Sequence, residues 1–128
     1  MTLELKLLVW STALALIQML IAVLAAIAQV GLLPLVGNRE NLAAFEGWAG
    51  RAQRAHHNML ESVTIFAALV LVAQVAGKSN AVTALGAQLF FWSRLAYAPV
   101  YVIGIPWLRT GVWCVSFAGL LQILSQIL

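Results

Sequence analysis

The sequence has few charged residues, one cysteine and no basic cluster, and each shortage excludes a class of protein. Only 9% of its 128 residues are charged, whereas a soluble globular domain carries about 25%, so the chain lacks the polar side chains that cover a water-exposed surface. The single cysteine, Cys114, excludes an internal disulfide and a CxxC metal or redox motif. The seven lysines and arginines are scattered, so the net charge of +3 does not indicate binding to nucleic acid.

Apolar residues, in contrast, make up 63% of the chain. Their long unbroken runs differ from the alternating pattern of a membrane β-barrel, and they predict helices, the other structure that can cross a bilayer. We predict an all-α fold, with residues 1–128 forming one domain, an integral membrane antiparallel four-helix bundle. The short connections between helices make successive helices antiparallel neighbours. The predicted helices cover about residues 5–33, 42–76, 80–103 and 107–127.

Several residues mark the expected ends of these helices. Pro34 follows the first apolar run, and Gly77 suits the left-handed conformation that ends many helices. Ser79 or Asn80 can cap the third helix through its side-chain oxygen. Pro106 suits the first turn of the fourth helix, where its missing N–H costs nothing. These positions agree with the four apolar runs.

The basic residues predict how the helices are oriented in the membrane. Four belong to the side of the first and third connections: Arg39, Arg51, Arg54 and Arg109. Two belong to the opposite side: Lys6 and Lys78. Because basic residues are enriched in cytoplasmic loops, we expect the first and third connections in the cytoplasm and both termini outside. The first apolar run continues too far for a cleavable signal peptide, and the five tryptophans lie mostly near predicted helix ends, as interfacial anchors do.

The second predicted helix carries a polar face. Arg51, Arg54, Asn58 and Glu61 are three, four and three residues apart, so they lie on one side of a helix. His56 points away from this side. A charged residue at the centre of a membrane helix costs about 2.5–3.5 kcal/mol on insertion, so such residues normally face a cavity or a partner.

The third and fourth predicted helices continue this polar region. Arg94, Tyr97 and Tyr101 are three and four residues apart and share a face. Arg109 begins the fourth helix at the level where the second helix begins. Antiparallel packing therefore brings the polar parts of the second, third and fourth helices to a similar depth.

Two interpretations of these residues follow from their charges. In the first, Glu61 pairs with Arg54 or Arg94 and only joins the helices. In the second, several arginines against one glutamate leave excess positive charge, which favours an anionic ligand. Arginine binds carboxylates through paired hydrogen bonds, and a carboxylate binds an ammonium group. A small molecule with carboxylates and an amine fits this set, while the apolar helix surfaces would hold a lipophilic substrate from the bilayer.

The segment Arg51-Ala-Gln-Arg-Ala-His-His-Asn-Met-Leu-Glu61 resembles the second-helix signature of the MAPEG family, the membrane-associated proteins in eicosanoid and glutathione metabolism. The spacing of Arg94, Tyr97 and Tyr101, followed by Arg109, is similar to the pattern of that family's third and fourth helices. The resemblance covers essentially the whole chain. It implies a homotrimer of four-helix bundles in the membrane, with glutathione bound in clefts between neighbouring subunits. For a bacterial-type member it also implies the inner membrane.

The resemblance assigns a role to each matching residue. It implies that glutathione is held by Arg54, Asn58 and Glu61. It implies that the pocket is completed by Arg51, Arg94, Tyr97 and Tyr101, and that Arg39 reaches the ligand of a neighbouring subunit. Arg109 would stabilise the glutathione thiolate, which would attack a lipophilic electrophile or reduce a lipid hydroperoxide. No metal site is expected, because adjacent histidines point about 100° apart on a helix.

Several departures from the family pattern leave the reaction open. Position 57 is histidine where some members have arginine, Tyr97 replaces the histidine of the prostaglandin-forming branch, and Thr110 replaces its serine. These differences favour a detoxifying transferase or peroxidase over an eicosanoid-forming enzyme. Because the family includes a member that binds lipid without catalysis, a non-catalytic scaffold that binds lipid and glutathione is the alternative. A small transporter is disfavoured, because the first helix has no charge beyond Lys6.

Overall fold

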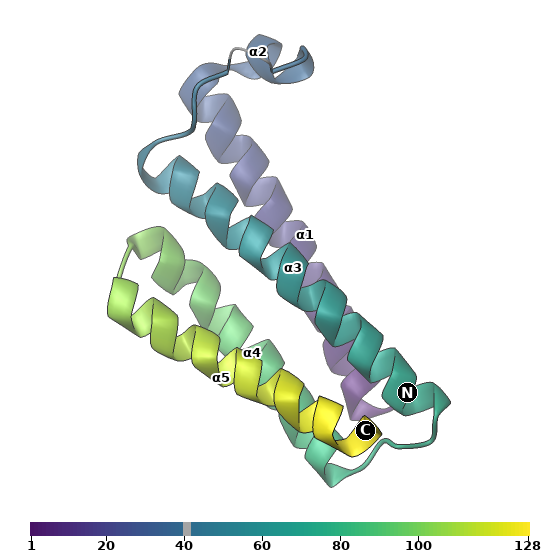
Figure 1. Cartoon of the computed structure of the whole chain (residues 1–128). Helices are drawn as coiled ribbons and strands as arrows, with labels where there is room; N and C mark the ends of the chain where they lie inside the picture. The colour runs from purple at the N-terminus through teal and green to yellow at the C-terminus, as the bar shows by residue number, and fades with distance from the viewer. Residues whose placement is uncertain (40–41) are drawn as a thin grey trace.

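The computed structural model describes residues 1–39 and 42–128, and its regular structure within these ranges is entirely helical (Figure 1). The helices are α1 (Leu3–Val30), α2 (Leu32–Val36), α3 (Gly47–Val75), α4 (Ala81–Ile103) and α5 (Pro106–Ile127). The predicted all-α class is therefore confirmed for the described part of the chain.

The four long helices form two pairs, α1 with α3 and α4 with α5, and α3 also contacts both helices of the second pair (Figure 1). Both termini and the α3–α4 connection lie at one end of the molecule, which we call the termini end. The short helix α2 and the α4–α5 connection lie at the opposite end, which we call the α2 end. Helix α1 also packs against α4, so both helices of the first pair contact the second pair.

The core is packed with aromatic and aliphatic side chains from all four long helices. Phe66 of α3 stacks on Phe90 of α4 with ring centroids 4.2 Å apart, and both rings are fully buried. Helices α4 and α5 approach each other closely at Gly86 and Gly119. A Cβ atom on Gly86 would lie 2.6 Å from the carbonyl oxygen of Gly119, so only glycine fits there. The backbones of α4 and α5 are thus in direct contact.

Three of the helices, α1, α3 and α5, are long and apolar enough to cross a membrane. Helix α1 exposes large apolar side chains along its outer side, among them Leu16, Leu20 and Leu24. Such a surface suits lipid and not water. Helix α4 is not in this set, because Gln88 and Arg94 lower its mean hydropathy.

The first two helices have different bounds from those predicted. The first helix ends at Val30 and not near residue 33, because Gly31 adopts a φ of +85° that interrupts the helix. The next residues form the separate helix α2, which contains Pro34. The second long helix begins at Gly47 and not near residue 42, and the main chain of Glu46 bonds instead to the side chain of Gln29.

The bounds of the last two helices agree with the predictions to within a residue. The Asn80 side chain accepts hydrogen bonds from the backbone N–H groups of Val82 and Thr83, so Asn80 caps α4 as expected. Pro106 is the first residue of α5, and Gly77 has a φ of +68° just beyond α3. Local capping signals therefore located these helix ends correctly.

Candidate functional site

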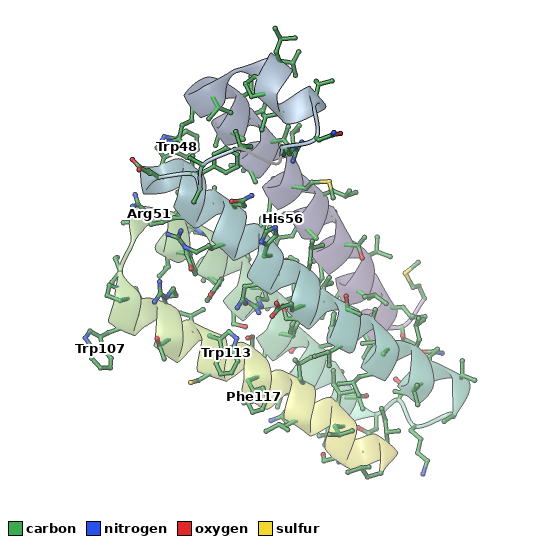
Figure 2. All side chains as sticks on the ribbon, turned by 45° about the horizontal axis from the view of Figure 1, so that its top comes forward. Trp48, Arg51, His56, Trp107, Trp113 and Phe117 are labelled. Carbon is green, nitrogen blue, oxygen red and sulfur yellow. The ribbon has the colours of Figure 1, made fainter. Side chains whose placement is uncertain are left out.

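Two arginines of α3 bond to the C-terminal part of α4 near the α2 end. The Nε of Arg51 donates to the carbonyl oxygen of Val102 at 2.8 Å, and the Nε of Arg54 donates to the Tyr101 hydroxyl at 3.3 Å. Figure 2 shows Arg51 on the side of α3 that faces α4. The predicted polar face of α3 therefore meets the predicted polar face of α4.

Arg94 of α4 lies deeper along the same interface and is only 1% exposed. Its Nη2 donates to Oδ1 of Asn58 at 2.6 Å, and its guanidinium lies 4.6 Å from the centroid of the Tyr97 ring. The other two nitrogens, Nε and Nη1, are buried and have no hydrogen-bond partner among residues 1–39 and 42–128. A buried charged donor without a partner is costly, so Arg94 is an unusual group within the described part of the chain.

Arg109 connects α5 to this cluster. Its guanidinium carbon lies 4.7 Å from the centroid of the Tyr101 ring, a cation–π geometry. Because the Tyr101 hydroxyl accepts a hydrogen bond from Arg54, Tyr101 contacts cations of both α3 and α5. The structure thus brings together seven of the predicted site residues: Arg51, Arg54, Asn58, Arg94, Tyr97, Tyr101 and Arg109.

A cavity of about 410 Å³ lies between α3, α4 and α5. It adjoins the cluster at Asn58 and Arg94 and extends from there toward the termini end. Its polar lining consists of Asn58, Glu61, Arg94 and the hydroxyls of Ser62 and Ser116. Its other lining residues are apolar: Ile65, Leu69, Trp113, Phe117, Leu120, Leu121 and Leu124. From Asn58 to Leu69 the α3 wall extends roughly 16 Å toward the termini end, at 1.5 Å per residue. The cavity is therefore polar near the arginines and apolar beyond them.

Glu61 lies at this cavity with its side chain exposed. Among the described residues it forms no ion pair with Arg54 or Arg94; the side-chain partner of Arg54 is Tyr101, and that of Arg94 is Asn58. The structure therefore gives no support to the interpretation of Glu61 as a charge that only joins the helices. Its carboxylate remains available to a ligand.

Arg39 is the one predicted site residue that the single chain places apart from the cluster. Its Nε donates to the carbonyl oxygen of Leu35 at 2.7 Å. It lines a second cavity, of about 270 Å³, between α1, α2 and α3, together with His56 and His57. Figure 2 shows His56 on the α1 side of α3, as its position off the polar face predicted.

Some cavity residues were not predicted as part of the site. Ser62, Ile65 and Leu69 continue the Asn58 face at helical spacing, and this spacing is the signal that could have found them. The interpretation of tryptophans as interfacial anchors does not extend to Trp113, which lines the cavity. Its position four residues after Arg109, on the same face of α5, is the corresponding signal.

Metal binding has no support in the geometry of residues 1–39 and 42–128, which bring no three His, Cys, Asp or Glu side chains together.

Comparison with known proteins was made by family, by curated protein and by solved structure. The MAPEG family model matches residues 7–128. No curated protein and no solved structure matches the chain. The matched range includes every residue of the cluster and of the cavity lining.

Proposed function

The chain belongs to the MAPEG family, and from this membership and the polar cluster we propose that it is a membrane-bound, glutathione-dependent transferase or peroxidase. Its substrates are lipophilic electrophiles or lipid hydroperoxides. The observation that carries the proposal is the buried Arg94, which lines the cavity beside Asn58 and Glu61 and whose Nε and Nη1 have no hydrogen-bond partner among the described residues.

Glutathione offers two carboxylates and one ammonium group, which matches the charges of the cluster. Because the bonds that Arg51 and Arg54 make within the chain use Nε, their terminal nitrogens remain free to bind carboxylates. The exposed carboxylate of Glu61 suits the ammonium group, and Asn58 and Arg94 lie beside it. The hydroxyls of Tyr97 and Tyr101 complete the binding set.

Arg109 is the proposed catalytic residue. A free thiol has a pKa of about 8.5, and the thiolate is the nucleophile. A nearby permanent cation lowers the pKa of the bound thiol and increases the thiolate fraction at neutral pH. The thiolate then displaces a leaving group from an electrophilic carbon. With a hydroperoxide, the thiolate attacks the terminal oxygen and the O–O bond breaks, which gives a lipid alcohol and glutathione sulfenic acid. A second glutathione then converts the sulfenic acid to the disulfide and water.

The apolar part of the cavity is the proposed place of the second substrate. Ile65 and Leu69 of α3 face Leu120 and Leu124 of α5 across it. The burial of apolar surface stabilises a bound chain or ring by about 25 cal/mol per Å². The reacting carbon or oxygen atom would lie toward Arg94 and Asn58, at the polar end.

We further propose that α4 is a fourth membrane span and that the protein forms homotrimers in a bacterial inner membrane. The connections α1–α3 and α4–α5 would face the cytoplasm, and both termini would lie outside. The separate position of Arg39 supports a role toward the ligand of a neighbouring subunit, because its own chain keeps it away from the cluster.

The alternative is a non-catalytic scaffold that binds lipid and glutathione. One observation favours it: Arg109 is not among the residues that line the cavity, although it contacts Tyr101 nearby. Turnover separates the two functions, because a scaffold binds glutathione without consuming it.

The test uses the full chain in lipid nanodiscs. Calorimetric titration with glutathione, oxidised glutathione and cysteine should show selective binding of glutathione, accompanied by a rise in ultraviolet thiolate absorbance at neutral pH. Glutathione-dependent consumption of an electrophile or a fatty-acid hydroperoxide should follow. Binding without turnover across a broad substrate panel would support the scaffold, and the absence of binding would contradict both functions.

A further inference from the structure

One wall of the cavity is aromatic and comes from a single helix. Trp113 and Phe117 of α5 are four residues apart, and their rings lie with centroids 5.3 Å apart and planes only 7° from parallel. Both line the cavity, and 38% of the Trp113 surface and 46% of the Phe117 surface remain exposed. The two rings therefore stack on each other and still leave aromatic surface uncovered.

Other aromatic residues have different surroundings. Phe66 and Phe90 stack in the closed core. Trp10 packs on Phe91 and is 43% exposed, but it lines none of the described cavities. Trp107 projects from the start of α5 and is 87% exposed, as suits an interfacial anchor (Figure 2). The Trp113–Phe117 pair differs from these because it borders an open cavity that also contains the Arg94 guanidinium.

The pair is also close to the proposed reaction centre. Trp113 follows Arg109 by four residues, so it lies on the same face of α5, roughly 6 Å further along the axis. Asn58 and Arg94 line the same cavity from α3 and α4. A ring placed against Trp113 would thus lie beside a thiolate held between Arg109 and these residues.

We propose that Trp113 and Phe117 form a stacking platform for planar aromatic electrophiles, and that the platform makes an electron-poor aryl halide a better second substrate than a saturated alkyl halide. This proposal rests on the proposed thiol-conjugating function. Aromatic rings prefer offset-stacked neighbours with centroids 4.5–7 Å apart, and the platform already has this spacing, so a third ring extends it. In the reaction, the thiolate sulfur bonds to the ring carbon that carries the halogen, and the halide ion leaves with the bonding electrons.

The test compares two glutathione conjugates that differ only in the group on sulfur, S-(2,4-dinitrophenyl)glutathione and S-hexylglutathione. Their affinities are measured by calorimetry in nanodiscs for the wild type, Trp113→Leu and Phe117→Leu. We expect Trp113→Leu to weaken the dinitrophenyl conjugate about 2- to 12-fold, the range of an aromatic pair, and to change the hexyl conjugate less than twofold. Trp107→Leu is the matched control on the same helix and should change neither affinity.

Free glutathione is titrated in parallel, so that failure of the platform and failure of the thiol site give different results. An equal loss for both conjugates, or no loss for the dinitrophenyl conjugate, would overturn the platform while glutathione binding persists. The absence of binding for glutathione and both conjugates in the wild type would overturn the proposed function and the platform with it. If Trp113→Leu does not fold, Trp113→Phe replaces it and should retain the preference for the aryl conjugate; loss of that preference in Trp113→Phe would overturn the platform.

Discussion

Among the described residues two charged side chains are buried, Glu4 and Arg94, and their surroundings differ. Glu4 of α1, which is 4% exposed, accepts hydrogen bonds at 2.6 Å from the hydroxyls of both Ser79 and Thr83. Arg94 of α4, which is 1% exposed, donates to Asn58, and two of its nitrogens have no partner in the part of the chain that the structure describes. The first charge is satisfied by the chain itself, and the second is not.

From this contrast we infer that Glu4 is a structural group and propose that Arg94 is a binding group. Glu4 joins α1 to the α3–α4 connection and to the first turn of α4, and these bonds offset the cost of its burial. The rings of Phe90 and Tyr97 near Arg94 compensate only part of its charge. A buried polar group left unsatisfied costs about 1–3 kcal/mol, and more when charged. The uncompensated cost at Arg94 is understandable if a ligand supplies the missing acceptors.

The largest expected effect is the loss of catalytic rate when Arg109, near the α2 end, is substituted. Arg109→Ala should lower kcat/KM for glutathione conjugation about 100-fold, the order seen when one group that stabilises developing charge is removed. The melting temperature should change little, because Arg109 is only half-buried. Steady-state kinetics and thermal unfolding in nanodiscs provide the measurements. Arg109→Lys, which keeps the charge, should lose less, and wild-type turnover in Arg109→Ala would remove this arginine from the mechanism.

Substitution of Arg94 tests the unsatisfied charge directly. Arg94→Met should weaken glutathione binding about 30-fold or more, because a buried ligand charge then lacks its partner. The stability of the ligand-free protein should stay the same or rise, because an uncompensated buried charge is removed. Calorimetry and ligand-free chemical unfolding measure the two quantities. A destabilised variant with unchanged affinity would show that Arg94 is structural, like Glu4.

Substitution of Glu4 should give the opposite pattern. Glu4→Leu is expected to lower the free energy of unfolding by about 1–2 kcal/mol, because the hydroxyls of Ser79 and Thr83 lose a shared acceptor. Glutathione affinity should not change, since Glu4 lies at the termini end. Glu4→Gln keeps an acceptor oxygen and should be milder. A loss of affinity with unchanged stability would contradict the division between the two buried charges.

The smallest effect is expected at the cap next to Glu4. Asn80→Ala removes the side-chain acceptor for the first N–H groups of α4 and should cost about 1 kcal/mol of stability, again with no change in glutathione affinity. Unfolding in denaturant measures this cost. Asn80→Ser retains a capping oxygen and serves as the control, so equal destabilisation by both variants would exclude capping as the cause.

The sequence predicted which residues share a helix face but not which residues meet across helices. Helical spacing placed Arg54, Asn58 and Glu61 on one side of α3, because the angle between residues on one helix is fixed. The partners Tyr101 and Arg94 depend on how α4 rotates against α3, and spacing within one helix carries no such information. Spacing within a helix also gives no distance from Glu61 to the arginines, so the sequence allowed an ion pair between them.

The termini end was harder still to predict. Glu4 precedes a long apolar run and looks like an ordinary flanking charge, since its partners Ser79 and Thr83 follow it in sequence by 75 and 79 residues. The early end of α1 depends on the backbone of Gly31, a residue that helices tolerate at moderate cost. Pro34, the stronger breaker by composition, lies inside α2 instead.

The contact between Gly86 and Gly119 makes α4 and α5 a single mechanical unit. With their backbones touching, the two helices cannot slide past each other without a collision, so they move together against α3. Gly119 is ten residues from Arg109, roughly 15 Å along the helix. If α5 tilts about the glycine contact, Arg109 moves in proportion to this distance. A tilt of about 5° at the glycines would displace Arg109 by roughly 1 Å, a distance sufficient to alter a reaction rate substantially. We therefore expect a larger residue at Gly86 or Gly119 to shift Arg109, because it would push the two backbones apart.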